Sequence, residues 1–344
     1  MSVQTIPTNL TSIGKCELPF ADSLLVVSYI AIIFIGVVGN GLVIAFFWGK
    51  LKKGVNLLIF YLAVFDELGC IIGPLVFLYW ILTCSNRWDF GWLGCKTLPT
   101  FSRVITNISS GVILLMAIDR CHSIVFPINQ RFPQKTIHAS IFATVVISII
   151  WEAFHIEGLH IDKNGTCVYN GLDNQHYAYL IVGMTSARTI VFLVIFSTTT
   201  TIMYKKIYNC KRMMFLKSSS SNTCKKNKSI KMLIIMAIAF ELSVLPRDIL
   251  HLSQAASWLP GCQKIVRYLP CQIIEETFVK KKEEYSLKII TNFIKRLNEW
   301  FRLIQISNGI YNVFIYAKIH AKFSKNLSDL TISFMQIFFS RTRK

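Results

Sequence analysis

Between Ser23 and Gly49 the chain carries no charged residue. A helix that crosses a bilayer needs about 20 consecutive apolar residues, so this run is long enough to span a membrane. Six further apolar stretches follow, at about 56–83, 97–124, 136–157, 176–204, 231–254 and 293–317. The sequence therefore predicts an all-α membrane protein with seven spanning helices. The segment before the first run carries almost no positive charge and has no apolar stretch apart from that run, so it does not read as a signal peptide. We therefore expect an uncleaved anchor.

Composition excludes several other classes of protein. Hydrophobic residues make up 53% of the 344 residues and charged residues only 16%, whereas soluble domains carry about 25% charged residues. The sequence contains no nucleophile elbow, phosphate-binding loop or spaced cluster of metal ligands, so we expect no enzymatic activity and no cofactor of that kind. It also lacks the internal repeats from which many transporters are built.

The distribution of positive charge indicates the orientation in the membrane. The formal net charge is +19, from 37 Lys and Arg against 18 Asp and Glu. Nine of these basic residues lie between Tyr204 and Met232, where no acidic residue occurs. With the basic residues after the first and third apolar stretches and at the C-terminus, they fall on one side of a seven-span topology. Positive loops are cytoplasmic, so we expect the N-terminus outside the cell.

This topology defines three regions of a multi-pass plasma-membrane protein. We expect an extracellular N-terminal segment over 1–22, a seven-helix bundle over 23–318 and a cytoplasmic amphipathic helix and tail over 319–344. In the tail, apolar residues recur at helical spacing with lysines between them, from Phe323 to Ile337. That pattern is typical of a helix lying on the anionic inner face of a membrane. We expect lipid as a partner, and no nucleic acid.

The predicted outer face carries its own signals. Asn9 and Asn164 begin glycosylation sequons in exposed segments. A third outer loop of unusual length, about 257–291, contains charges of both signs. One interpretation of this loop is a solvated insertion or an error in the gene model. The other is a lid that captures a ligand.

Several short motifs occur together in a fixed order. They are Gly39-Asn40, Leu62-Ala-Val-Phe-Asp66, Trp88-Asp-Phe90-Gly91, Cys95, Asp119-Arg120-Cys121, and Asn308-Gly-Ile-Tyr-Asn312-Val-Phe-Ile-Tyr316. Each motif is weak by itself. Together, over about residues 20–340, they resemble the rhodopsin-like (class A) G-protein-coupled receptors, and among them the peptide receptors.

The resemblance has departures that mark a divergent member. Cys121 replaces the family's tyrosine after Asp-Arg, and Val313 replaces the proline of Asn-Pro-x-x-Tyr. The tryptophan that precedes Pro246 in the family is absent, although Phe240 keeps its place, and Phe196 stands where helix five usually carries proline. A heptahelical protein that no longer signals, such as a decoy, is therefore an alternative reading.

The resemblance implies which residues take part in coupling to a G protein. They are Asp119, Arg120, Tyr204, Phe240, Pro246, Asn312 and Tyr316. In the family, the arginine is held by its neighbouring acid at rest and meets the G protein on activation. Many members also have an acid at the inner end of helix six, whereas that region here is basic around Lys226. We therefore expect signalling without ligand.

The resemblance also implies a sodium site and a disulfide. Asp66, Ser109, Asn308 and Asn312 match the residues that hold a buried sodium ion in the family; a protonated Asp66 in a polar network is the alternative. Cys95 and Cys167 match the family's disulfide between helix three and the second outer loop. Four more cysteines fall outside the cell on this topology, and they allow three pairings: Cys16, Cys84, Cys262 and Cys271. A link from Cys16 to Cys262 or Cys271 would tie the N-terminal segment to the long loop.

Residues in the extracellular half of the bundle predict the chemical class of the ligand. Ser102 occupies the helix-three position at which amine receptors carry aspartate, so a biogenic amine would lack its counter-ion. The candidate cavity residues are instead charged: Arg103, Arg188, Arg247, Asp248 and Arg302. Guanidinium groups pair with carboxylates in bidentate fashion. A peptide is the favoured ligand, and a small acidic or lipid ligand is the alternative. Glu152, Arg247 and Asp248 could equally lie near helix ends and reach toward water.

Overall fold

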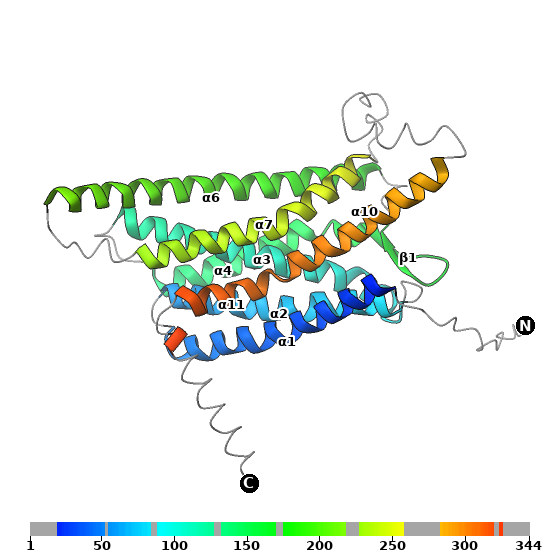
Figure 1. The fold of residues 1–344 in the computed structure, drawn as a ribbon, viewed down its shortest axis with the longest axis horizontal. Coiled ribbons are helices and arrows are strands. Elements are labelled where there is room, and N and C mark those ends of the chain that lie inside the picture. Colours follow the sequence, from blue (N-terminus) through cyan, green and yellow to red (C-terminus); the bar gives the residue numbers. More distant parts are fainter. Residues whose placement is uncertain are drawn as a thin grey trace, which may run out of the picture.

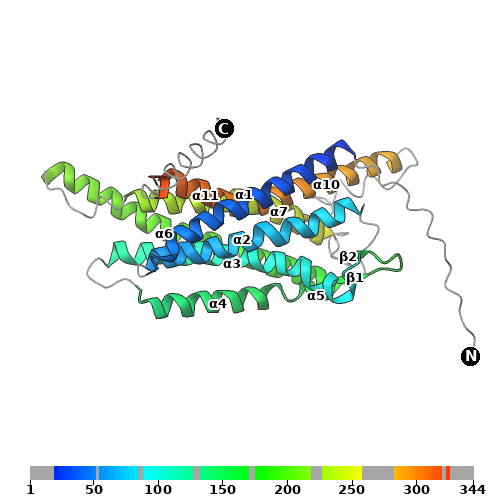
Figure 2. The same ribbon diagram turned by 90° about the horizontal axis from the view of Figure 1, so that it is seen from below.

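The computed structural model describes residues 19–51, 54–83, 88–126, 132–169, 175–217, 227–257, 283–319 and 323–325. The helices run side by side in one bundle, with a short β-hairpin at one end (Figures 1 and 2). Their bounds are α1 Phe20–Trp48, α2 Gly54–Leu82, α3 Gly91–Val125, α4 Gln134–Glu152, α5 His155–Gly158, α6 Gln175–Lys217, α7 Asn227–Ser257, α10 Glu283–Ile306 and α11 Asn308–Ile319. The hairpin strands are β1 Leu159–Ile161 and β2 Cys167–Tyr169.

The expected seven-helix membrane bundle is confirmed. In the described part of the chain, five stretches are long and apolar enough to cross a bilayer by themselves: α1, α2, α3, Gln134–Gly158 and Tyr179–Lys205 within α6. The sixth and seventh helices of the bundle, α7 and the pair α10–α11, are more polar. Their charged side chains include Asp248, which is buried against the neighbouring helices. Charges inside a membrane usually face the bundle interior, and this placement explains the weaker hydropathy of the last two spans.

Two boundaries differ from those expected from the sequence. Helix α10 begins at Glu283, so the last part of the expected outer loop, 283–291, is helical. Helix α6 continues to Lys217, well past the apolar stretch that ended near 204, and it extends beyond the other helices at the cytoplasmic end of the bundle (Figure 1). Several features named from the sequence lie outside the described residues: Asn9, Cys16, Lys226, Cys262, Cys271 and the tail beyond residue 325.

Close packing joins the first helices. α1 packs along α2, and α2 along α3. At Gly36, an added Cβ would lie 2.4 Å from the Cβ of Cys70 on α2, so the two backbones approach closely there. Toward the cytoplasmic end, Phe47, Met116, Phe240 and Tyr316 belong to one apolar cluster that draws on α1, α3, α7 and α11. These contacts fix the helices that carry the motifs.

The outer end is covered by the hairpin. β1 and β2 pair antiparallel, and a disulfide joins Cys167 of β2 to Cys95 near the start of α3, as the family resemblance implied. At the hairpin tip, the backbone N–H of Thr166 donates to Asp162 Oδ1 at 2.8 Å. This hydrogen bond lowers the pKa of the Asp162 carboxyl. Asn164, the glycosylation candidate, is exposed at this tip.

Candidate ligand cavity and coupling site

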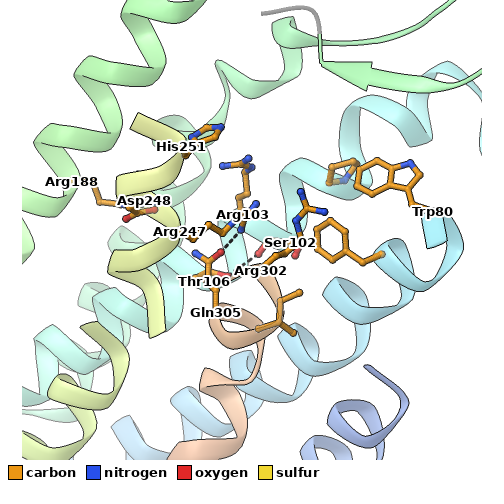
Figure 3. Close-up of a pocket in the computed structure, with 13 residues that line it drawn as sticks. Trp80, Ser102, Arg103, Thr106, Arg188, Arg247, Asp248, His251, Arg302 and Gln305 are labelled. Atoms are coloured by element: carbon orange, nitrogen blue, oxygen red, sulfur yellow. Dashed lines mark hydrogen bonds and ion pairs between the residues drawn. The ribbon is translucent and has the colours of Figure 1, made fainter. Parts of the chain in front are cut away.

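A cavity of about 40 Å³ lies between the outer halves of α2, α3, α6, α7 and α10. Every cavity residue predicted from the sequence lines it: Ser102, Arg103, Arg188, Arg247, Asp248 and Arg302. Further lining residues are Phe77, Trp80, Pro99, Thr106, His251, Gln305 and Ile306. Figure 3 shows the arginines converging on this space from α3, α6, α7 and α10. Four guanidinium groups and one carboxylate therefore line the cavity.

Arg188 joins four helices. Its Nη2 lies 2.5 Å from Asp248 Oδ2 of α7, and its Nη1 lies 3.0 Å from Asn107 Oδ1 of α3. Nη1 also lies 3.5 Å from Glu152 Oε1 at the end of α4. Figure 3 shows Arg188 beside Asp248 at the edge of the cavity. The arginine thus connects α6 with α3, α4 and α7 through two carboxylates and one amide.

Glu152 lies inside the bundle, not at a water-exposed helix end. Its side chain is 3% exposed, and its Oε2 lies 3.1 Å from His155 Nε2. Asn107 Nδ2 donates to Oε1 at 2.5 Å, and His155 Nδ1 lies 3.1 Å from the Tyr177 hydroxyl. Asp248, 7% exposed, is likewise buried. Both acids therefore face the interior of the bundle, and the alternative of a helix end reaching toward water is wrong for them.

The other cavity arginines also have defined contacts. The Arg302 side chain donates to both carboxylate oxygens of Glu299, at 3.1 and 2.9 Å, and its guanidinium lies 4.2 Å above the Phe77 ring. Arg247, which the sequence allowed near a helix end, donates instead to the side-chain oxygen of Gln305. These contacts hold both guanidinium groups at the cavity wall.

A polar cluster lies deeper in the bundle, around Asp66. Ser109 Oγ donates to Asp66 Oδ1 at 2.8 Å, and Asn312 Nδ2 donates to Oδ2 at 2.7 Å. Asn308 is buried beside them, and its Oδ1 has no hydrogen-bond partner in the described part of the chain. A small cavity of about 20 Å³ is lined by Asp66, Ser109 and Asn308. The four residues that the sequence grouped are therefore together in space.

At the cytoplasmic end of α3, Arg120 Nη2 lies 3.0 Å from Asp119 Oδ2, and both side chains are buried. Tyr316 is fully buried on α11, and Phe240 packs in the same apolar cluster. Tyr204, by contrast, is 66% exposed on α6 and stacks on Tyr208. The structure thus brings Asp119 and Arg120 together and leaves Tyr204 on the outside of the bundle.

Sequence reasoning missed part of this site. Asn107, His155 and Gln305 each contact a charged cavity residue or its partner, but none was predicted as functional. Each is a common polar residue, and only the position of its partner on another helix identifies it.

Comparison with known proteins agrees with this geometry. Residues 39–316 match the model of the family described as 7 transmembrane receptor (rhodopsin family), and the chain belongs to this family. The protein is thus a multi-pass receptor of the plasma membrane, in a family of receptors and not of enzymes. The dog C5a anaphylatoxin chemotactic receptor 1 is 23% identical over 307 residues, which cover 84% of each chain.

Two further proteins illustrate the range of similarity. Rat chemerin-like receptor 1 is 37% identical over 145 residues, covering 41% of this chain and 38% of that protein. The crystal structure of squid rhodopsin matches with a TM-score of 0.66 and 17% identity, covering 90% of this chain and 85% of the rhodopsin chain. At that identity, the match to rhodopsin shows the common fold alone.

Proposed function

We propose that the protein is a G-protein-coupled receptor for an extracellular peptide that presents an acidic group to the arginine-lined cavity. The observation that carries this proposal is the composition of the cavity wall, with four arginines and one aspartate. Such a wall has an excess of positive charge, and a carboxylate gains bidentate hydrogen bonds from a guanidinium group. The relatives named C5a anaphylatoxin chemotactic receptor 1 and chemerin-like receptor 1 support a peptide as the ligand.

The cavity must widen when a ligand binds. Its volume is about 40 Å³, whereas ligand pockets typically enclose about 300–1,000 Å³. Contacts between helices at its wall include those of Arg188 with Asp248 and Glu152. A ligand carboxylate competes with these protein carboxylates for the same guanidinium, so binding and loosening of α7 are linked. A small acidic ligand would use the same chemistry and is the alternative.

The cytoplasmic half supports G-protein coupling. The buried Asp119–Arg120 pair lies where α3 reaches the inner face. Loss of that pairing would free the guanidinium to meet a G protein, as the family resemblance implies. The decoy alternative predicts that no such coupling occurs.

We also propose that Asp66, Ser109, Asn308 and Asn312 hold a sodium ion. The fit rests on a buried carboxylate and a hydroxyl oxygen at a cavity of about 20 Å³. It rests also on the Oδ1 atoms of Asn308 and Asn312, which have no hydrogen-bond partner among the described residues. One water-sized particle needs about 10–15 Å³, and hard oxygen ligands suit a small hard cation. The ion would supply positive charge to a buried carboxylate.

The ligand proposal is tested with a synthetic peptide library in which each peptide exists with a free C-terminal carboxylate and as the C-terminal amide. G-protein activation is measured in cells that express the wild type, Arg247→Gln, Arg302→Gln or, as the matched control, Arg296→Gln. Arg296 lies on α10 with Arg302 but pairs with Asp22 and does not line the cavity.

We expect active peptides to be acidic and to lose about 10- to 100-fold in potency in the two cavity variants, because a hydrogen bond to a charged group contributes about 1.5–3 kcal/mol. The control should retain wild-type potency. Active peptides that work equally well as neutral amides, and that respond equally to all three variants, would contradict the proposal.

A further inference from the structure

The arginine-lined cavity is too small for the end of a peptide in the arrangement that the structure shows. Its volume is about 40 Å³, and one water molecule needs about 10–15 Å³. A monatomic ion therefore fits the cavity without any movement of the helices, whereas a peptide enters only after the cavity widens. The closed cavity is thus matched in size to an inorganic ion.

The wall of the cavity carries more positive than negative charge. Its described residues include four guanidinium groups and the carboxylate of Asp248. Glu152 and Glu299 each pair with one of these arginines, which gives three carboxylates for four guanidinium groups. Buried charges are costly unless they are balanced, and like charges in a low dielectric repel strongly. An anion with one charge offsets the excess of one that these residues leave.

Arg302 and Arg247 supply hydrogen-bond donors for such an anion. Arg302 Nε is buried and has no hydrogen-bond partner in the described part of the chain, although Nη1 of the same guanidinium donates to Glu299. Arg247 donates to the side-chain oxygen of Gln305, which is neutral. Figure 3 shows Arg247, Arg302 and Gln305 around one space. Hydrogen bonds from charged donors to an anion are the strong ones.

We propose that the arginine-lined cavity binds a chloride ion between Arg247 of α7 and Arg302 of α10, and that an acidic ligand must displace this ion. The second part rests on the proposed function, because it uses the same guanidinium groups. The first part does not. The ion links α7 with α10 and stabilises the closed cavity.

The test is thermal unfolding of the full-length receptor in sodium chloride and in sodium gluconate. The sodium concentration is the same in both buffers, and gluconate is too large for the cavity. Arg302→Gln removes one guanidinium group from the wall. Arg296→Gln is the matched control, because Arg296 lies on the same helix but does not line the cavity. Gln305→Glu places a carboxylate of nearly the same size as the amide beside Arg247.

We expect chloride at about ten times its dissociation constant to raise the melting temperature of the wild type by about 3–6 °C over gluconate. Arg296→Gln should show the same rise, and Arg302→Gln should show none. Gln305→Glu carries its own anion, so it should melt in gluconate as high as the wild type does in chloride, and chloride should add nothing. Because this variant gains stability, it separates loss of the ion from damage to the fold.

A second readout is the chlorine NMR signal, which exchange with a protein site broadens. The wild type should broaden it, excess bromide should reverse the broadening, and Gln305→Glu should not broaden it. Equal melting temperatures of the wild type in the two salts, or an equal rise in Arg302→Gln and Arg296→Gln, would overturn the proposal.

Both readouts work without signalling and without a peptide. A chloride effect in a receptor that no acidic peptide activates would therefore count against the proposed function alone. Activation by acidic peptides without any chloride effect would count against this inference alone.

Discussion

The ion pair between Arg188 and Asp248 is predicted to stabilise the outer half of the bundle. The substitution Asp248→Asn removes one charge from a contact in which Nη2 and Oδ2 lie 2.5 Å apart. Breaking a buried pair by removing one partner typically costs about 3–5 kcal/mol. The cost is reduced here because Arg188 keeps Glu152 and Asn107 as partners and its side chain is 22% exposed. We therefore expect a loss of about 2 kcal/mol, at the low end for such pairs.

That loss corresponds to a fall of about 4–8 °C in the melting temperature, if each kcal/mol shifts a large domain by about 2–4 °C. The assay is thermal unfolding of purified receptor in detergent, followed with a dye that fluoresces on reaction with thiols. Cys70 is fully buried, so its thiol reacts when the packing of α1 against α2 is lost.

The matched control is Glu299→Gln, which also removes one carboxylate from an arginine. Glu299 pairs with Arg302 three residues away on the same helix, with both side chains partly exposed. Pairs of this kind contribute about 0.3–0.5 kcal/mol, so its melting temperature should fall by less than about 2 °C. The double variant Arg188→Gln/Asp248→Asn should lose less than the sum of its single variants. Equal shifts for Asp248→Asn and Glu299→Gln would refute the reasoning.

Three further predictions concern separate parts of the molecule. Asp66→Asn should abolish any rise in melting temperature that NaCl, compared with choline chloride, gives the wild type; a rise retained in the variant would contradict a sodium ion at this carboxylate. Gly36→Ala should destabilise the receptor by about 1–3 kcal/mol, because its Cβ would lie 2.4 Å from that of Cys70. Gly183→Ala, with nothing within 4 Å of the added Cβ, should be neutral, and equal shifts for the two would disprove the steric explanation. Asn164→Gln should remove one enzyme-sensitive glycan from the protein, seen as a mobility shift on a gel; an unchanged pattern would show that the hairpin tip is not modified.

The sequence predicted the fold because hydropathy and positive charge act over whole segments. Seven apolar stretches and a basic inner face were enough to predict the bundle and its orientation, and the motifs located Asp66 and Arg120. The pairing of Cys95 with Cys167 followed from the family resemblance and agrees with the structure.

The features that the sequence did not predict depend on contacts between helices. The sequence could not decide whether Glu152 and Asp248 faced water or the bundle, since both lie near the ends of their apolar stretches. Their common partner, Arg188, is distant in the sequence and decides the matter only in three dimensions. The early start of α10 at Glu283 was missed for a different reason. Its first turns are too polar to be recognised as a continuation of a membrane helix.

We propose that this chain activates G proteins through Arg120. The most direct test is ligand-independent G-protein activation, measured across the main G-protein families for the wild type and for Arg120→Ala at matched surface expression. We predict activity above that of empty cells for the wild type and its loss in the variant. A wild-type receptor that reaches the surface, yet activates no G protein above the level of empty cells or of Arg120→Ala, would contradict the account.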